Sequence, residues 1–272
     1  PAGGKAGVQV AGGVTLDASG LWSQSLQEED ALAGGKLAYR HGGSVSLRSS
    51  GDVLLRQDSR IDVRSGAAQL AGGAVRGGKG GNVTLETRMQ GSDRAAGLAF
   101  AGALLGQGME GGGTLQVRAA KVLIGAPALA ADTLQLDSGF FDKGFARYDI
   151  GGNGGLTVAD GAQVAVTMPL LRLAGQEVEA WLSPVYREDA AKGVLTQLQA
   201  GVADVSGGAD MANVQARIGH GAVLEVDPGQ SITVAGIGQL TLDGRLNAWG
   251  GKIALEGMAG DVQAGEAANG AG

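Results

Sequence analysis

Pairs of glycines that precede short alternating segments constrain the fold of this chain more than any other feature. Glycine accounts for 52 of the 272 residues, against a usual share of about 7%. The pairs stand before runs in which apolar and polar residues alternate: Gly42-Gly43-Ser44-Val45-Ser46-Leu47, Gly80-Gly81-Asn82-Val83-Thr84-Leu85, Gly112-Gly113-Thr114-Leu115-Gln116-Val117, Gly154-Gly155-Leu156-Thr157-Val158 and Gly250-Gly251-Lys252-Ile253-Ala254-Leu255. A turn followed by a very short strand, repeated many times, is typical of a β-solenoid.

The spacing of apolar residues is clearest between residues 43 and 64. Val45, Val53 and Ile61 stand at intervals of eight, and the apolar residues two positions after each keep the same interval. Alternation within such short strands places one face in the core and the other in water. This stretch therefore predicts three strands that make one lap of about 22 to 25 residues.

The composition fits a thin aliphatic core in one continuous domain, residues 1–272. Apolar residues make up 44% of the chain but aromatic residues only 4%. Flexible glycine linkers lack alternating Val, Leu and Ile, so the pattern favours a folded array. The repeat pattern reaches almost to both ends without an evident polar cap, and we interpret the chain as an interior fragment of a longer protein.

Charge and cysteine content limit the partners and the compartment. The net charge is −6 and no run of Lys or Arg occurs, which argues against nucleic acid and anionic membrane as partners. No apolar stretch approaches the 18 residues of a membrane-spanning helix. The chain has no cysteine, so disulfides do not hold the fold, and their absence favours an exported bacterial protein.

Four stretches interrupt the rhythm and are predicted to be excursions from the solenoid. They lie near residues 17–40, 88–111, 137–150 and 175–217. Within the last, Ser183-Pro184 has the residue types of a helix start, and apolar residues from 190 to 202 follow helical spacing. The sequence thus predicts one short α-helix in an otherwise all-β chain.

Three segments of the chain resemble the filamentous haemagglutinin family, the large exoproteins of bacterial two-partner secretion. The resemblance rests on Gly51-Asp52-Val53-Leu54-Leu55, on Ile61-Asp62-Val63, and on an aromatic stretch, Gly139-Phe140-Phe141-Asp142-Lys143-Gly144-Phe145-Ala146-Arg147-Tyr148-Asp149-Ile150, that runs into the glycine pair at 154. It covers most of the chain, although residues 175–217 contribute little.

The resemblance implies a right-handed parallel β-helix that a partner transporter exports across the outer membrane, so that it is secreted or displayed at the cell surface. The transporter recognises a region for which this chain offers no clear match. The expected function is a structural and adhesive rod that carries a binding site for a cell-surface protein or glycan receptor. The alternative is the receptor-binding or stalk region of a contact-dependent inhibition toxin.

Motifs for cofactors and metals lack their structural context. The stretch from Gly73 to Gly80 nearly matches a phosphate-binding loop, but the Ser or Thr after Lys79 is missing and a strand follows. Residues 106–111 fit G-x-G-x-x-G and also lead into a strand. The two histidines, His41 and His220, stand alone, so we predict neither a cofactor nor a metal site.

Parallel β-helices also form polysaccharide-degrading enzymes, which gives a second alternative. Hydrolysis of a glycoside needs two carboxylates that face each other across the sugar. Asp52, Asp58 and Asp62 lie on one predicted lap, with arginines between them. A solvated face with weak mutual ion pairs is the favoured interpretation, and we predict no catalytic residue and no enzyme activity.

The candidate recognition residues are Trp181, Tyr186 and Arg187, in the stretch 175–217. Trp, Tyr and Arg are the usual anchors of protein interfaces, and excursions from a rigid scaffold commonly carry binding. The alternative is that Trp181 only packs this stretch onto the solenoid. The aromatic residues between 140 and 148 are predicted to pack in the core, because otherwise they would form an exposed apolar patch.

Overall fold

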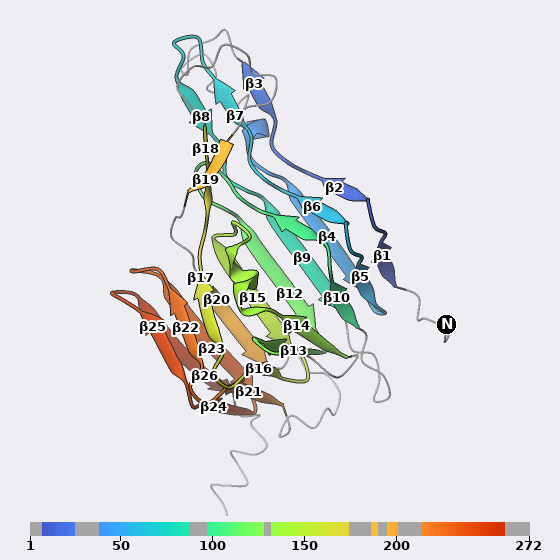
Figure 1. Cartoon of the computed structure of the whole chain (residues 1–272), viewed down its shortest axis with the longest axis vertical. Helices are drawn as coiled ribbons and strands as arrows, with labels where there is room; N and C mark the ends of the chain where they lie inside the picture. The colour runs from blue at the N-terminus through green and yellow to red at the C-terminus, as the bar shows by residue number, and fades with distance from the viewer. Residues whose placement is uncertain are drawn as a thin grey trace, which may run out of the picture.

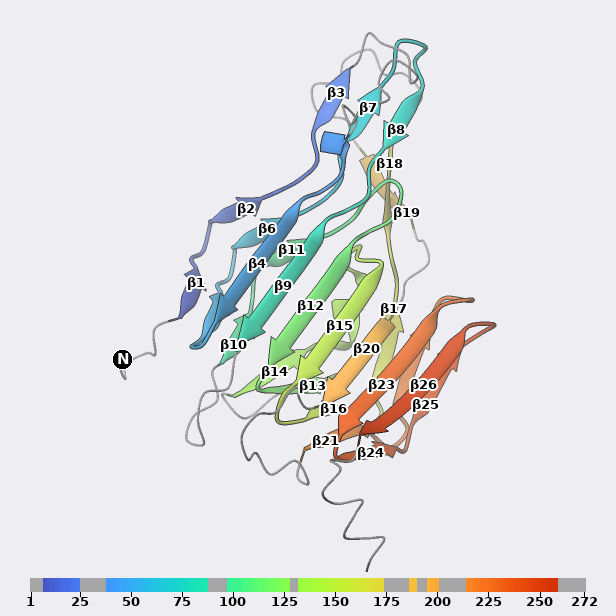
Figure 2. The ribbon, with the colours of Figure 1, turned by 180° about the vertical axis from the view of Figure 1, so that it is seen from behind.

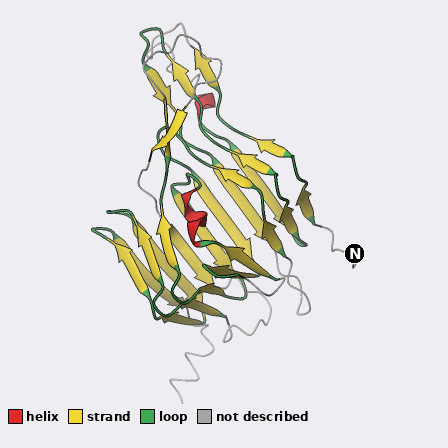
Figure 3. Cartoon of the chain, in the orientation of Figure 1, coloured by secondary structure: helices red, strands yellow, loops and turns green. Residues whose placement is uncertain are grey.

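The computed structural model shows an elongated, all-β protein built mainly from parallel sheets (Figure 1). It describes residues 7–24, 38–87, 97–127, 132–173, 186–189, 195–200 and 214–258. Figure 3 shows how little of this is helix: η2 (Ala38–Arg40) and η3 (Ser138–Asp142), both 3-10 helices. The strands group into three sides around a common core, with a lateral extension at one end.

The first side is a seven-stranded parallel sheet whose strands follow one another in chain order (Figure 2). From edge to edge they are β4 (Ser44–Ser49), β9 (Asn82–Thr87), β12 (Thr114–Ala119), β15 (Arg147–Gly152), β20 (Leu195–Ala200), β23 (Ser231–Ile237) and β26 (Lys252–Met258).

The second side consists of two parallel sheets, and β10 of the first lies against β14 of the second. The first sheet contains β1 (Val8–Val10), β5 (Val53–Leu55) and β10 (Leu98–Phe100). The second contains β14 (Thr133–Leu136), β13 (Lys121–Ile124), β16 (Leu156–Val158), β21 (Gln215–Ile218) and β24 (Gln239–Leu242).

The third side also consists of two parallel sheets, and helix η3 joins them. The first contains β2 (Thr15–Asp17), β6 (Arg60–Asp62) and β11 (Ala103–Leu105), and the second β17 (Gln163–Val166), β22 (Val223–Val226) and β25 (Arg245–Ala248). The Gly106 N–H donates to the Lys143 carbonyl, 2.9 Å away, and the Thr167 N–H donates to the Phe141 carbonyl, also at 2.9 Å. The η3 segment therefore takes the place of a strand.

The chain visits the sides in a fixed order. From β4 it runs to β5 on the second side and β6 on the third before β9 returns to the first side. Later passes follow the same order, except that the pass between β12 and β15 places both β13 and β14 on the second side and η3 on the third. A pass can be as short as Ser231 to Lys252, which is 21 residues, or as long as Arg147 to Leu195, which is 48. The predicted strands near Val45, Val53 and Ile61 are confirmed as β4, β5 and β6, each on a different side.

The core lies between the three sides and is aliphatic, as predicted. In β12 the side chains alternate between half-buried and buried, with Leu115 and Val117 inward. Each inward residue lies beside the inward residue of the next strand, as in the row Leu85, Val117 and Ile150. The aromatic exception is Phe140, Phe141, Phe145 and Tyr148, all at most 7% exposed, which confirms that these residues pack in the core.

The glycine pairs that begin at residues 42, 80 and 112 sit where neighbouring passes of backbone approach closely. A Cβ on Gly81 would lie 1.8 Å from the Gly43 carbonyl oxygen, and one on Gly112 would lie 1.8 Å from the Gly144 carbonyl oxygen. Real Cβ atoms do not approach a backbone oxygen so closely, so no other residue fits there without moving the neighbouring pass. Close approach explains these three pairs. At Gly155 and Gly250 the reason is turn geometry instead, because φ is 138° and 64° and a Cβ would meet no atom closer than 3.4 Å.

The predicted α-helix is wrong over its described residues. Strands β19 (Tyr186–Asp189) and β20 stand in its place. Strand β20 pairs with β15 on one side and β23 on the other. A helix there would leave the backbone donors and acceptors of both neighbours unpaired, and this requirement outweighs the helical spacing of the side chains.

The predicted excursions contain more of the sheets than expected. Strand β20 lies within 175–217, β15 begins within 137–150, and β10 and β11 lie within 88–111. Short strands without an alternation of apolar and polar residues, such as Leu98–Phe100, are not recognised from the sequence pattern. Ser183 and Pro184 lie outside the described residues.

Candidate recognition surface

A lateral extension leaves the core where the chain passes from the third side to the first (Figures 1 and 2). It contains η2 and four further strands besides β19: β3 (Trp22–Gln24), β7 (Ala67–Gln69), β8 (Val75–Gly77) and β18 (Leu170–Leu173). Strand β3 pairs with β7 in parallel, β7 and β8 form an antiparallel hairpin, and β18 pairs with β19 antiparallel.

Hydrogen bonds to backbone carbonyls tie the extension together. The Arg40 carbonyl accepts from the Gly66 N–H at 2.8 Å, and the Arg40 Nε donates to the Gly77 carbonyl at 2.6 Å. The Glu110 N–H donates to the Gly78 carbonyl, 3.0 Å away, and the Leu171 N–H donates to the Gly108 carbonyl, 3.2 Å away. Segments from five separate parts of the chain are thereby held at one place on a rigid scaffold.

Two large side chains project from this extension into solvent. Tyr39 is 72% exposed and Leu21 is 63% exposed, and the Leu21 N–H donates to the Tyr39 carbonyl at 2.7 Å. Isolated exposed apolar residues are ordinary, but these two are neighbours beside the hairpin. An exposed tyrosine on a fixed backbone is a typical anchor for a binding partner.

Cationic side chains gather around the same elements. Arg76 on β8, Lys79 just after it and Arg172 on β18 are exposed, and Arg40 is half-buried. The Lys79 N–H donates to His41 Nδ1 at 2.9 Å, which places His41 next to them. The same extension also carries the acidic residues Glu110, Glu188 and Asp189, so its described residues hold more cations than anions on a chain whose net charge is −6.

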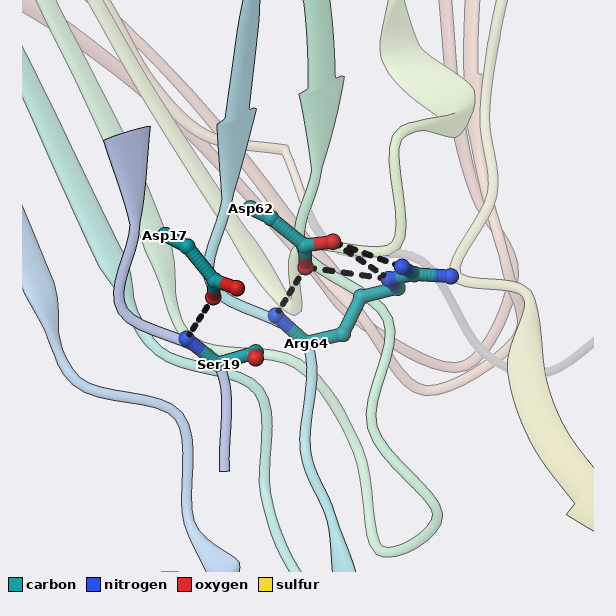
Figure 4. Close-up of polar contacts among 4 residues, drawn as sticks. All are labelled: Asp17, Ser19, Asp62 and Arg64. Atoms are coloured by element: carbon teal, nitrogen blue, oxygen red, sulfur yellow. Dashed lines mark hydrogen bonds and ion pairs between the residues drawn. The ribbon is translucent and has the colours of Figure 1, made fainter. Parts of the chain in front are cut away.

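An acidic pair lies at the root of the extension (Figure 4). Asp17 on β2 and Asp62 on β6 are register partners in adjacent strands. Asp62 is buried and paired with Arg64, whose Nε and terminal nitrogen lie 3.0 Å from Oδ1 and 2.6 Å from Oδ2 respectively. The Ser19 N–H donates to Asp17 Oδ1 at 2.9 Å, and this bond, with Arg64 acting in the same direction, holds the pKa of Asp17 below its usual value.

The structure gives each aspartate of the catalytic alternative a structural contact. Asp52 Oδ1 accepts from the Gly97 N–H of the next pass at 2.8 Å. Asp58 occupies the turn before β6 with φ 65°, and Asp62 pairs with Arg64. The three residues stand before β5, in the turn before β6 and at the end of β6.

Two of the three predicted recognition residues, Tyr186 and Arg187, fall in the extension. Tyr186 and Arg187 begin β19, where their backbones pair with Leu173 and Arg172 of β18. Trp181 lies outside the described residues. The structure therefore places the backbone of this candidate site beside the cationic surface around β8, which the sequence analysis did not identify.

Sequence reasoning missed Tyr39, Arg76 and Lys79 as neighbours, and Asp17 as the partner of Asp62. The lengths of successive passes differ, so no constant repeat aligns residue 17 with residue 62 or residue 40 with residue 77. The available signal is local: Arg76 and Lys79 stand in a Gly-rich stretch that breaks the alternation, which is how an excursion is recognised.

Outside the extension, the described residues form a less marked surface feature. A shallow hollow of about 360 Å³ lies on the outer surface of the second side, lined by Lys121, Thr133, Thr157 and Gln215 among others. Lys121 Nζ there is paired with Asp132 Oδ2 at 3.2 Å. Within the described parts of the chain, no cluster of three or more metal-ligating side chains occurs. Nor does any described helix have the length and apolar character needed to cross a membrane.

Comparisons of this chain with protein families, with curated proteins and with solved structures gave no match.

Proposed function

We propose that this chain is a right-handed parallel β-helix segment of a large secreted surface exoprotein, in which it acts as a structural and adhesive rod. The observation that carries the proposal is the path of the chain: seven strands of the first side follow in order, with the second and third sides visited between them. Right-handedness is supported by the general rule that parallel crossover connections are right-handed in about 98% of cases.

The lateral extension is the proposed binding surface of this rod. Tyr39 and Leu21 supply exposed contact area, and Arg76, Lys79 and Arg172 supply positive charge. Backbone bonds to the core fix these residues in advance, which lowers the entropy cost of binding. We therefore infer a negatively charged receptor at a cell surface, either a protein or a glycan.

The rod supports two settings for this binding. In the first, the chain belongs to an adhesin of the filamentous haemagglutinin kind, exported by a partner transporter and displayed or released. In the second, it belongs to the stalk of a contact-dependent inhibition toxin, and the extension binds an outer-membrane receptor of a neighbouring cell. The identity of the receptor distinguishes the two.

A binding screen tests the proposal. The purified chain is applied to a glycan array and to immobilised bacterial and host outer-surface proteins, beside three variants. Tyr39→Ala removes the exposed ring, and Arg76→Ser with Lys79→Ser removes charge. A third variant replaces residues 174–185, Trp181 among them, by Asn-Gly, since Leu173 and Tyr186 are paired and a two-residue turn can join them. Strand β20 is retained because it belongs to the first side.

Binding should weaken about tenfold in Tyr39→Ala and in the double variant. Arg245→Ser is the matched control, since Arg245 is an exposed cation on β25, away from the extension. Circular dichroism verifies the fold of every variant. Equal binding by all variants, or a ligand lost only with Arg245→Ser, would place recognition elsewhere and contradict the proposed surface.

A further inference from the structure

The outer face of the second side carries a hollow that a glycine pair leaves open. Val122 on β13 is the register partner of Leu156 on β16. Lys121, one residue earlier on β13, therefore lies beside Gly155, whose carbonyl accepts from the Val122 N–H at 3.1 Å. Gly154 and Gly155 bring no side chain to this row, and a hollow of about 360 Å³ lies over them.

The hollow lies inside the stack of strands. Its lining comes from four neighbouring strands of one parallel sheet, β14, β13, β16 and β21. The sheet continues with β24 beyond β21, and β10 of the preceding sheet lies against β14. Backbone pairing fixes each of these strands to the next, so the lining is in place before a ligand arrives. A preformed site loses less conformational entropy on binding.

Uncharged polar groups that both donate and accept hydrogen bonds line the hollow. The Thr157 hydroxyl comes from β16 and the Gln215 amide from β21. Each group can donate and accept, and neither side chain has a hydrogen-bond partner among the described residues. Leu123, the register partner of Thr157 on β13, adds a half-buried apolar surface. The lining thus offers polar groups of both kinds beside a small apolar area.

The charges around this hollow are already paired. Lys121 Nζ lies 3.2 Å from Asp132 Oδ2, and the Thr133 hydroxyl donates to Asp132 Oδ1 at 3.3 Å. The Arg217 terminal nitrogen on β21 lies 2.7 Å from Asp160 Oδ1. A negatively charged ligand would compete with carboxylates that are in place. A neutral ligand with adjacent hydroxyls can instead donate to Asp132 and accept from Lys121, whose ammonium has three donors.

The lining favours binding of a sugar over its cleavage. Hydrolysis of a glycoside uses two carboxyl groups that flank the scissile bond. Asp132 lies beside the hollow, and the described residues that line it include no Asp or Glu. The volume of about 360 Å³ is near the lower end of the roughly 300 to 1,000 Å³ of small-ligand sites. The hollow therefore suits a small part of a longer molecule.

Polar residues continue from the hollow toward β24. Gln215 on β21 is the register partner of Gln239 on β24, and in the parallel row Arg217 is the partner of Thr241. Neighbouring strands are about 4.8 Å apart. An extended chain of sugars laid along the stack would therefore meet one polar side chain after another beyond the hollow.

We propose that this hollow binds a neutral hexose unit of an extended polysaccharide: a glucan, a mannan or a galactan. Sugar hydroxyls donate to Asp132 and accept from Lys121, and the Thr157 hydroxyl and the Gln215 amide bind the same unit from β16 and β21. The rest of the polysaccharide passes over β24. The site lies on the second side, so it is independent of the receptor surface proposed on the lateral extension.

Isothermal titration calorimetry of the 272-residue chain tests the site. The neutral probes are maltohexaose, cellohexaose, mannohexaose and a galactan oligosaccharide, with hexagalacturonate as the charged counterpart. At least one neutral probe should bind with a Kd of about 1 mM or lower and should be recovered intact. Its affinity should not fall as NaCl is raised, because salt screens only charged ligands. Hexagalacturonate should bind more weakly than that probe.

Two variants locate the binding. Thr157→Val removes the hydroxyl and keeps the shape, and Gln215→Ala removes the amide. Each should lower the affinity about twofold to tenfold, as expected for one lost hydrogen bond. Gln163→Ala is the matched control, since Gln163 is exposed on β17 of the third side, and it should bind as the unchanged chain does. Circular dichroism verifies the fold of each variant.

Three results would overturn the proposal. The first is that none of the neutral probes binds. The second is that hexagalacturonate binds more tightly than every neutral probe and loses affinity with salt, which would indicate a site for anions. The third is that a neutral probe binds Thr157→Val and Gln215→Ala as tightly as it binds the unchanged chain, which would place the sugar elsewhere on the protein.

Discussion

Single residues fix how closely neighbouring passes approach. Gly81 and Gly112 lie so near the carbonyl oxygens of Gly43 and Gly144 that a methyl group has no room. A glycine also makes room for a charged side chain. Arg118 donates to both carboxylate oxygens of Asp149, at 2.9 and 2.8 Å. The Arg118 side chain lies where a Cβ on Gly151 would be. These contacts link adjacent strands of the first side.

We predict that Gly81→Ala destabilises the protein by at least about 2 kcal/mol, because the neighbouring backbone must move to admit the methyl group. Gly72→Ala is the matched control. Gly72 is exposed in the turn of the β7–β8 hairpin, and a Cβ there would meet no atom within 4 Å, so its change should stay within about 0.5 kcal/mol. Urea unfolding of both variants measures the difference, and equal stabilities would contradict the close-approach explanation.

A second prediction concerns pH and Asp160, in the turn after β16. The His220 backbone N–H and the Arg217 guanidinium donate to Asp160 Oδ1 at 2.9 and 2.7 Å, and they hold the pKa of this carboxyl below its usual value. A depressed pKa in the folded state gives stability that is present above the unfolded pKa and is lost as pH falls through the folded value.

Asp160→Asn should therefore lower Tm at neutral pH, and the difference from the unchanged chain should shrink as the pH falls below 4 or so, since the reference pKa of Asp is about 3.9. Asp58→Asn is the control, because its φ of 65° suits Asn well. Thermal unfolding at several pH values gives the comparison. A Tm difference that is constant with pH would show that the charge of Asp160 does not contribute to thermal stability.

At the scale of elements, η3 and its aromatic residues replace a strand on the third side. Phe141 and Tyr148 have ring centroids 5.4 Å apart, and Phe145 and Tyr148 are 6.0 Å apart, all edge to face. The Lys143 N–H donates to the Tyr148 hydroxyl at 2.9 Å, and burial raises the pKa of that hydroxyl above its usual value. The rings therefore form one buried aromatic cluster beside η3.

Phe145→Ala should cost about 3 to 5 kcal/mol, because a buried ring leaves a cavity between sheets that cannot close over it. Tyr148→Phe keeps the ring and removes only the hydroxyl that accepts from Lys143, so it should cost about 0.5 to 1.5 kcal/mol. Chemical unfolding followed by circular dichroism measures both. A smaller loss for Phe145→Ala than for Tyr148→Phe would contradict a packing role for these rings.

At the scale of the whole molecule, each pass packs only on its neighbours, so stability should decline from the middle to the ends. Strands β12 and β15 each have two neighbours on the first side, whereas β26 has one and leaves Ile253 and Leu255 half exposed. Amide hydrogens of β12 and β15 should exchange more slowly than those of β26 by hydrogen exchange with mass spectrometry. Uniform protection along the first side would indicate one cooperative unit instead.

Much of the local structure is predictable from the sequence, because strand alternation and glycine pairing are short-range signals. The strands near Val45, Val53 and Ile61 and the buried aromatic residues between 140 and 148 agree with the structure. The predicted helix after Ser183 does not agree with the structure, because residues 195–200 form strand β20 of the first side. The sequence predicted only part of the recognition surface. Tyr186 and Arg187 lie in the extension, but Tyr39, Arg76 and Lys79, which come from distant parts of the chain, were not predicted.

By itself, the sequence determines that this chain forms short strands with one buried face, separated by glycines, around an aliphatic core. These properties depend on neighbours within a few residues. The tertiary structure decides which strands become neighbours, where the chain leaves the core, and which charges meet, such as Arg64 with Asp62 or Arg118 with Asp149. The physical reason is that pairing joins segments 21 to 48 residues apart on the first side. The backbone hydrogen bonds between passes are nearly independent of residue type, so they leave no local signal in the sequence of which strands will meet.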